Sequence, residues 1–417
     1  MKKKYGLYMS SVALLMGVCA NFVGCEQDER PFYDDNELPK KDAQSYTIGK
    51  ESAEKDALIA AESFFANDGT QIKREVASVN ALMGGENSRD TIAFVCNFKG
   101  DAGFAIIAAD RRVVDKVVVC ADEGHFSEDT DNPGFRDLLD HIKNYTERKI
   151  AAAVARSTKN SKGLKNTTAD GDSLIPMPAK QVGPLIKTAW NQTAPYNAFL
   201  DTCPSGYPYY TGCTITALAQ LIGYYNQPGI EMMPEMTAKK HAQELDDFHK
   251  TWVGILFRSL WRDLPKRFNG CAVGVLGYDA LTYLQEYDYH TQGVSFYSSG
   301  SVLNSISEQH PVMVSSATAS GGHTWLMDGY RIEQFRSASD SANVVEGDTY
   351  FHINWGWGGD CDGWFAAGCF DVDAAIEYDN KYHTNRNQKY MYGLDSFYAW
   401  PKPQAENQEL DTEGLEK

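Results

Sequence analysis

Cys213 is the residue of this chain best suited to covalent chemistry. Apolar residues follow it at Ile215, Leu218, Ala219 and Ile222, which is the spacing of a half-buried helix. A helix beginning at Cys213 would hold the thiol at its positive end, where the dipole favours the thiolate and lowers the pKa below its free value of about 8.5. Taken alone, the pattern still favours a small buried residue, which is what most free cysteines are.

A cysteine nucleophile needs a base, and the chain has 9 histidines from which to choose. Only His323 lies in a suitable context: Gly321 and Gly322 precede it, and residues 324–327 read as a short strand that ends in an Asp-Gly turn. The paired glycines leave the imidazole uncrowded. His323 is therefore the candidate general base.

A third segment, residues 350–359, could orient that base. Alternation along a strand puts His352 and Asn354 on one face, and Ile353 and Trp355 on the other. The Asn354 amide could hold an imidazole in the productive tautomer, and Trp355 could shield it from water. The same residues fit equally well a glycine-rich strand end that only packs.

Two features on the N-terminal side of Cys213 could complete the site. Gln192 has a side-chain amide that could donate a hydrogen bond to a developing oxyanion. Thr211 is expected to cap the helix, and Gly212 to leave the approach to the sulfur open. An isolated glutamine in a polar turn would carry no such inference without the other segments.

Together these segments resemble the streptopain family of papain-like cysteine peptidases. The matching motifs are Asn-Gln-x-x-Pro-Tyr-Asn at 191–197, Thr-Gly-Cys at 211–213, Gly-Gly-His at 321–323 and His-x-Asn-Trp-Gly-Trp-Gly-Gly at 352–359. The resemblance implies that Cys213 is the nucleophile and His323 the general base. It also implies that Gln192 completes the oxyanion hole with the Cys213 N–H, and that Asn354 and Trp355 orient and cover the histidine.

The resemblance also implies an α+β fold, with a papain-like peptidase domain over residues 181–401. A helical part would carry Cys213, an antiparallel sheet would carry His323 and Asn354, and the cleft would lie between them. The expected activity is that of a cysteine endopeptidase made as a zymogen, with protein or peptide substrates. No metal or organic cofactor is implied, and reducing conditions should be needed.

Two features depart from the family pattern. Thr324 and Trp325 follow the histidine where smaller residues are common, and residues 379–392 are polar and basic where streptopain carries a glycine-rich loop. Both changes can reshape the substrate site, so substrate preference does not transfer.

The first 24 residues predict a bacterial secretory signal. Lysines at positions 2–4 precede a short apolar run over residues 10–20. The run ends in Phe-Val-Gly-Cys, which resembles a lipobox and predicts acylation of Cys25 after cleavage. Residues 26–29, Glu-Gln-Asp-Glu, resemble the acidic tags of lipoproteins sent to the outer surface. The expected location is extracellular or on the outer membrane by a lipid anchor, and the alternative is an ordinary signal followed by release.

Residues 25–165 form a separate unit by composition. Helices are expected over 52–65 and 132–155, and strands over 91–98, 103–109 and 116–120. By resemblance this unit is the propeptide, which acts as an intramolecular inhibitor, and the alternative is a domain that binds another partner. Residues 166–180 are expected to be an exposed processing linker, with the cut between Lys162 and Lys180, and residues 402–417 an acidic disordered tail.

Composition narrows the partners and cofactors. A net charge of −17 with a pI near 5.0 argues against nucleic acid. Cys361 and Cys369 lack the spacing of a zinc site, and the Asp-Cys-Asp-Gly string at 360–363 lacks the distal ligands of a calcium loop. We interpret that string as a turn. The pairing of the remaining cysteines does not follow from sequence.

Two other functions fit parts of the sequence. One is a non-catalytic surface lipoprotein that binds host or matrix proteins through a papain-like domain. Intact residues at all the matching catalytic positions argue against it, because binding does not need them. The other is a transglutaminase or acyltransferase, which shares the thioester step. The Trp-Gly-Trp-Gly-Gly string at 355–359 favours the peptidase.

Overall fold

The computed structural model describes residues 46–66, 73–85, 90–159, 174–318, 321–338, 344–371 and 394–402. The predicted signal peptide, Cys25 with its predicted acylation, the polar stretch 379–392 and the tail from residue 403 lie outside these residues. Among the described residues, no helix combines the length and apolar character that a membrane span requires.

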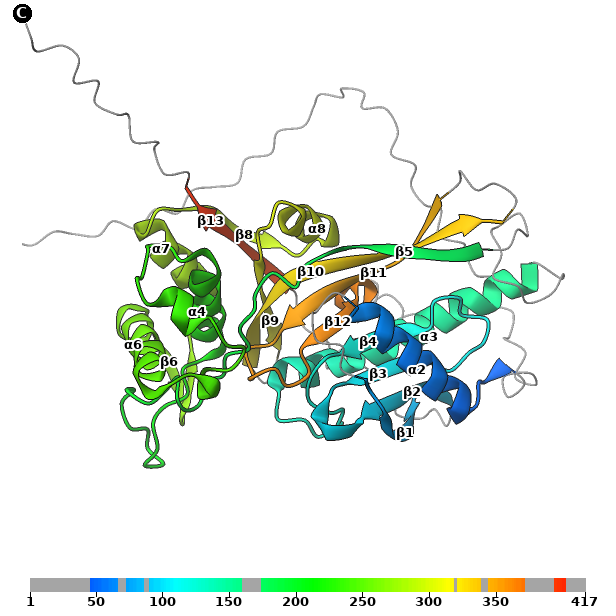
Figure 1. Cartoon of the computed structure of the whole chain (residues 1–417), viewed down its shortest axis with the longest axis horizontal. Coiled ribbons are helices and arrows are strands. Elements are labelled where there is room, and N and C mark those ends of the chain that lie inside the picture. Colours follow the sequence, from blue (N-terminus) through cyan, green and yellow to red (C-terminus); the bar gives the residue numbers. More distant parts are fainter. Residues whose placement is uncertain are drawn as a thin grey trace, which may run out of the picture. The chain divides into compact units, whose positions relative to one another are not determined.

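The N-terminal part folds as two helices and four antiparallel strands (Figure 1). The helices are α2 (Lys50–Phe64) and α3 (Pro133–Lys159), and the strands are β1 (Val76–Met83), β2 (Thr91–Phe98), β3 (Phe104–Ala108) and β4 (Val117–Ala121). Both predicted helices and all three predicted strands are present. Strand β1 was not predicted, because its residues are only partly buried and carry no clean alternation.

In its described residues, the C-terminal part contributes five further α-helices and nine strands. The helices are α4 (Cys213–Tyr225), α5 (Met233–Met236), α6 (Asp247–Asp263), α7 (Gly277–Glu286) and α8 (Ser299–Ser307). The strands are β5 (Leu174–Val182), β6 (Arg267–Asn269), β7 (Ala272–Gly274), β8 (Tyr289–Phe296), β9 (Val312–Thr318), β10 (Gly321–Ser337), β11 (Val344–Asn354), β12 (Gly363–Ala366) and β13 (Leu394–Pro401).

One antiparallel sheet runs through both parts of the chain. Its order is β1-β2-β3-β4-β12-β11-β10-β9-β13-β8, with β5 pairing β10. The two parts join where β4 pairs β12, with Gly363 opposite Ala121 and Phe365 opposite Val119. A Cβ atom at Gly363 would lie 2.4 Å from the Cα of Ala121. Glycine at this position therefore lets the two backbones approach closely.

Helices cover both faces of the sheet at this junction. Successive residues of a strand point to opposite faces, and α2 and α3 contact successive residues of β12. Phe64 of α2 packs edge-on against Trp364, and Phe135 of α3 packs against Phe365. The two helices of the N-terminal part therefore lie on opposite faces of the shared sheet.

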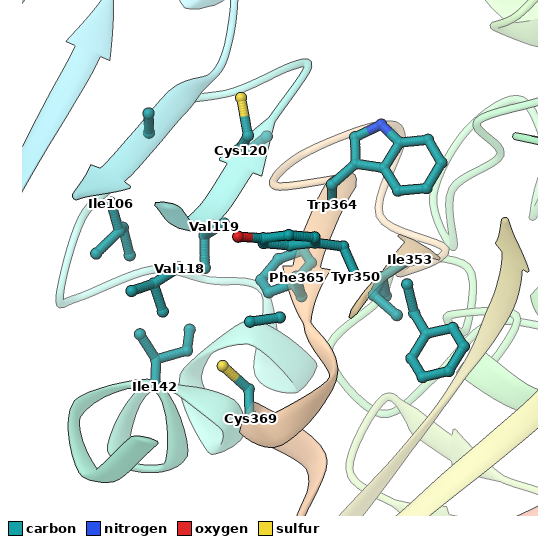
Figure 2. Packing of buried hydrophobic residues seen from close by; sticks show 14 of the residues in the cluster. Ile106, Val118, Val119, Cys120, Ile142, Tyr350, Ile353, Trp364, Phe365 and Cys369 are labelled. Carbon is teal, nitrogen blue, oxygen red and sulfur yellow. The ribbon is translucent and has the colours of Figure 1, made fainter. Parts of the chain in front are cut away.

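The two parts also share a hydrophobic core. Figure 2 shows Ile106, Val119 and Ile142 of the N-terminal part beside Tyr350 and Phe365 of the C-terminal part. All five side chains are fully buried. Because their separation would expose this surface, the N-terminal part is a folded partner of the C-terminal part rather than a loosely attached tail.

A second core surrounds helix α4. It packs apolar residues of α4, α6 and α7 against Met313 of β9, Leu326 of β10 and Phe397 of β13. The helical part and the sheet part thus meet at β9, β10 and β13, and β10 is the strand that carries His323. This arrangement confirms the predicted α+β class.

The second half of the predicted processing linker forms a strand. Residues 174–180, expected to be exposed linker, belong to strand β5, which pairs with β10 from Leu174 opposite Ser337 to Val182 opposite Tyr330. The extended backbone of this segment finds its hydrogen-bond partners in β10. Residues 160–173 lie outside the described residues.

Candidate active site

Helix α4 begins at Cys213, as predicted, but its cap differs from the expectation. The N-cap residue is Gly212, with φ +92° and no side-chain cap hydrogen bond. A Cβ atom at Gly212 would lie 2.6 Å from the Val273 carbonyl oxygen, so only glycine fits without a shift. Thr211 is buried, and its hydroxyl pairs with that of Thr216 at 2.9 Å instead of capping the helix.

The thiol of Cys213 is half-buried and strongly acidic for a cysteine. Burial alone would raise its pKa, but the charge and hydrogen bond of His323, with the backbone N–H groups of Thr324 and Thr214, lower the pKa to about 7. By contrast, burial raises the pKa of Cys96 and of Cys120 to about 12. Cys213 is therefore the cysteine poised to react.

His323 lies on β10 beside the start of α4, and the structure brings it together with Cys213 as predicted. Its Nε2 donates a hydrogen bond to the backbone carbonyl of Trp355 at 2.9 Å. A carbonyl only accepts, so Nε2 carries a proton and Nδ1 is the nitrogen available to the sulfur. The imidazole is held in the tautomer that a general base requires.

Asn354 does not contact the imidazole through its side chain. Its Nδ2 donates to the Thr188 carbonyl at 2.8 Å, and its Oδ1 accepts from Gln220 Nε2 at 2.9 Å and from the Gly356 N–H at 3.2 Å. No hydrogen bond joins the Asn354 amide to His323 in the described part of the chain. The amide is already committed elsewhere, and the Trp355 carbonyl takes its place.

Trp355 lies beside the imidazole, with ring centroids 6.2 Å apart and an angle of 34° between the planes. It is fully buried, and its Nε1 donates to the Cys361 carbonyl at 3.1 Å. Trp325, named above as a departure, stacks on His323 at 6.3 Å, packs against Trp355 with ring centroids 5.2 Å apart and is also fully buried. Both tryptophans therefore support the imidazole from the core.

The backbone of Gln192 is hydrogen-bonded to the segment that precedes the nucleophile. Its carbonyl accepts a hydrogen bond from the Thr211 N–H at 3.1 Å, two residues before Cys213. Its own N–H donates to Asn191 Oδ1 at 2.6 Å. No hydrogen bond engages its side-chain amide within the described part of the chain, so the amide is available for a substrate oxygen.

A disulfide bond ties down the segment before the nucleophile. Cys203 pairs with Cys271, at the turn between β6 and β7. The Tyr210 N–H donates to the Cys271 carbonyl at 3.1 Å in the same region. The pairing joins the chain just before Gly212 to the hairpin that contacts it, and the sequence did not specify it.

Asp362 binds the backbone of Trp355, the residue whose carbonyl orients His323. The sequence alone does not single out Asp362, because the Asp-Cys-Asp-Gly string at 360–363 is interpreted as a turn. The carboxylate is buried, and its Oδ1 accepts a hydrogen bond from the Trp355 N–H at 2.8 Å. Burial and the charge of Asp122 raise its pKa to about 8, although the Trp355 N–H, Lys240 and His352 act to lower it.

No cluster of three or more potential metal ligands is found among the described residues.

The N-terminal part covers the site. A Cβ atom at Gly134, in the first turn of α3, would lie 2.4 Å from His323 Cδ2 and 2.5 Å from Trp355 Cε3. Helix α3 thus begins directly against the imidazole, and only 2% of the His323 surface is exposed. Nearby, Asn132 Nδ2 donates to the Asp360 carbonyl at 2.9 Å.

A thiol of lowered pKa beside an oriented imidazole, covered by a second folded part of the same chain, defines a cysteine peptidase in zymogen form. Comparison with known proteins agrees. The model of the Peptidase C10 family matches residues 190–255 and 266–365, and that of the Spi protease inhibitor matches residues 49–146. Over these residues the chain is similar to the peptidase C10, or streptopain, family.

Relatives span several bacteria. Over 415 residues the chain is 24% identical to streptopain from Streptococcus pyogenes serotype M1, covering 87% of this chain and 92% of streptopain. Over 350 residues it is 25% identical to the thiol protease/hemagglutinin PrtT of Porphyromonas gingivalis, covering 73% of this chain but only 37% of PrtT. A solved prointerpain A fragment from Prevotella intermedia has 18% identity and a TM-score of 0.47, covering 77% of this chain and 97% of the fragment.

Proposed function

We propose that this chain is the zymogen of a cysteine endopeptidase in which the Cys213 thiolate attacks the peptide bond. The carrying observation is the Cys213–His323 pair: the pKa of the thiol falls to about 7, and the Trp355 carbonyl binds Nε2 so that Nδ1 is left for the sulfur. A buried structural cysteine would need neither feature.

Acylation begins with transfer of the thiol proton to Nδ1 of His323. The sulfur then bonds to the scissile carbonyl carbon, and the carbonyl oxygen takes the negative charge. We assign Gln192 and the Cys213 N–H as donors to this oxyanion, in line with the free Gln192 amide and its backbone link to Thr211. As the C–N bond breaks, His323 returns its proton to the leaving amine, which yields a thioester on Cys213.

Deacylation reverses the proton path. His323 Nδ1 removes a proton from water, the resulting hydroxide attacks the thioester carbonyl, and the C–S bond breaks. The products are a carboxylic acid and the thiolate–imidazolium pair. The buried tryptophans beside the imidazole, Trp355 and Trp325, keep bulk water away from its far side.

Latency follows from the position of the propeptide. Helix α3 begins against His323, so a leaving-group segment has no space there while the propeptide is docked. Docking is supported by the shared sheet and core, and by ion pairs of Lys240 with Asp122 at 3.1 Å and with Glu123 at 2.7 Å. Cleavage before strand β5 would free the propeptide to leave.

The location proposed is extracellular or on the outer membrane, through the predicted signal and acylation of Cys25. A lipid at Cys25 would anchor the zymogen only by its propeptide, so maturation would release the catalytic domain.

The test is hydrolysis of casein by the matured chain, together with labelling by a thiol-directed epoxide and peptide mapping. We expect reductant-dependent hydrolysis, internal cleavage products and an adduct on Cys213. Absence of both hydrolysis and adduct after treatment with a general protease would favour a non-catalytic binding protein. Amine incorporation in place of hydrolysis would indicate an acyltransferase.

A further inference from the structure

Gln220 is a buried polar residue on the helix of the nucleophile that the mechanism above does not use. It lies seven residues after Cys213 in α4, two helical turns along the same face. Only 1% of its surface is exposed. Its neighbours along the helix, Leu218 and Leu221, are apolar and belong to the helical core. An amide buried in such surroundings is costly unless its hydrogen bonds are made.

Every polar atom of the Gln220 side chain has a partner from another segment. Its Oε1 accepts from the Trp190 N–H at 2.9 Å and from the Thr188 hydroxyl at 3.1 Å. Its Nε2 donates to Asn354 Oδ1 at 2.9 Å. One side chain on α4 therefore bonds to two segments distant in sequence.

The first of these bonds leads to the general base. Asn354 Oδ1, which accepts from Gln220, also accepts from the Gly356 N–H at 3.2 Å. That N–H and the Trp355 carbonyl belong to one planar peptide unit. The carbonyl end of the same unit accepts from His323 Nε2. Gln220 and His323 are thus joined through Asn354 and a single peptide unit.

The second set of bonds leads to the oxyanion donor. Thr188 and Trp190 stand four and two residues before Gln192, whose carbonyl is bound by the Thr211 N–H. Asn354 Nδ2 also donates to the Thr188 carbonyl at 2.8 Å, which closes the network between the two segments. The approach of the chain to Gln192 is therefore fixed from α4.

We infer that Gln220 is a positioning residue for catalysis. It holds the peptide unit that orients His323, and the segment that carries Gln192, in register with the helix that carries Cys213. The inference rests on the proposed cysteine peptidase function. It predicts that loss of the Gln220 amide disturbs the thiolate–imidazolium pair itself, beyond any effect on the stability of the fold.

Two variants separate the two sets of bonds. Gln220→Glu keeps the acceptor for Trp190 and Thr188 but loses the donor to Asn354, whereas Gln220→Met loses both and keeps the approximate shape. Leu221→Ala is the control, because Leu221 is fully buried on the same helix and has no part in the polar network. All three variants are made in the whole proprotein. If Gln220→Met fails to fold, Gln220→Glu still tests the inference.

The first readout is the pH dependence of alkylation of Cys213 by iodoacetamide, resolved by peptide mapping. It needs no proteolytic activity, so its failure is distinct from failure of the proposed function. The unaltered chain should titrate near pH 7. We expect the midpoint to move upward by about one pH unit or more in Gln220→Glu, and to stay unchanged in Leu221→Ala despite a lower melting temperature. A low midpoint retained in Gln220→Glu would overturn the inference.

The second readout is kinetic. After maturation, Gln220→Glu should lower kcat by about 10²-fold with KM nearly unchanged, since misplaced groups cost about that much. Residues that act as one unit have non-additive effects. Combining Gln220→Glu with Asn354→Leu should therefore cost little more than either change alone. Fully multiplicative losses would show that the two residues act separately and would contradict the inference.

Discussion

The backbone carbonyl of Trp355 accepts a hydrogen bond from Nε2 of His323 at 2.9 Å. This bond leaves Nδ1 for the sulfur of Cys213, whose pKa falls to about 7. A main-chain group thus performs the orienting role that the sequence had assigned to the Asn354 side chain. Asn354 acts at one remove, because its Oδ1 binds the Gly356 N–H of the same peptide unit.

Replacing Asn354 should therefore impair catalysis less than replacing His323. Asn354→Ala leaves the Trp355 carbonyl in place but frees its peptide unit, and we expect kcat to fall by about 10²-fold. His323→Ala removes the base and should cost at least about 10⁴-fold. Steady-state kinetics of the two matured variants checks this order. Equal losses would show that Asn354 holds the imidazole directly in the reacting enzyme.

Gln192→Ala tests the oxyanion assignment. Loss of one oxyanion donor costs about 10²–10³-fold in kcat, and we expect that loss with little change in KM. The alkylation profile of Cys213 should stay the same, since Gln192 has no hydrogen bond to the sulfur–imidazole pair. Gln285→Ala, on the exposed side of α7, is the matched control and should retain full activity. Normal turnover by Gln192→Ala would remove it from the mechanism.

Gly134→Ala tests the propeptide contact. The added methyl group would overlap His323 and Trp355, and overpacking of this kind costs about 1–3 kcal/mol. The cost falls on the docked zymogen alone, so Cys213 should become alkylated about tenfold faster or more at neutral pH. Gly49→Ala is the control, because no atom lies within 4 Å of its Cβ position. Equal alkylation rates in both variants would mean that α3 does not shield the site.

Asp362 should give the zymogen a distinct pH dependence. Burial and the negative charge of Asp122 raise its pKa to about 8, although Lys240, His352 and the Trp355 N–H oppose this shift. The folded chain therefore binds this proton more tightly than the unfolded chain, whose Asp titrates near about 3.9. The stabilisation is fully present below about pH 4 and is lost as pH rises toward 8, by at most about 1.4 kcal/mol per pH unit.

Asp362→Asn isolates that contribution. An asparagine keeps an oxygen for the Trp355 N–H but cannot ionise, so the melting temperature should fall less steeply between pH 4 and pH 8. Other groups, including Asp115 with its pKa raised to about 7, remain in both proteins and cancel in the comparison. If the melting temperatures of the two proteins change in parallel between pH 4 and pH 8, Asp362 does not take up a proton on folding.

The reacting residues could be found from sequence because each sits in a short motif. Cys213 begins an amphipathic helix, and His323 follows two glycines at the start of a strand. The groups that hold them could not be found in this way. A backbone carbonyl such as that of Trp355 leaves no signature in residue types. Gln220 and Asp362 gain their meaning only from bonds between segments distant in the chain.

The positions of the strands were predictable to a similar degree. Strands β2, β3 and β4 carry apolar runs and were located within a residue or so of their ends. The sequence of strand β5 does not indicate a strand, because its hydrogen-bond partner, β10, lies about 150 residues away. The continuation of the propeptide sheet into the peptidase through β4 and β12 is likewise a long-range pairing, and so is the bond between Cys203 and Cys271.

Maturation of the purified chain, residues 25–417, tests the central claim most directly. The chain and its Cys213→Ala variant are incubated with and without reductant, and their intact masses are followed over time. We expect the reduced, unaltered chain to shorten to a form that begins between residues 162 and 174, while the variant stays whole. If the variant shortens at the same rate, or if neither is cut and Cys213 takes no epoxide label, Cys213 is not a working nucleophile.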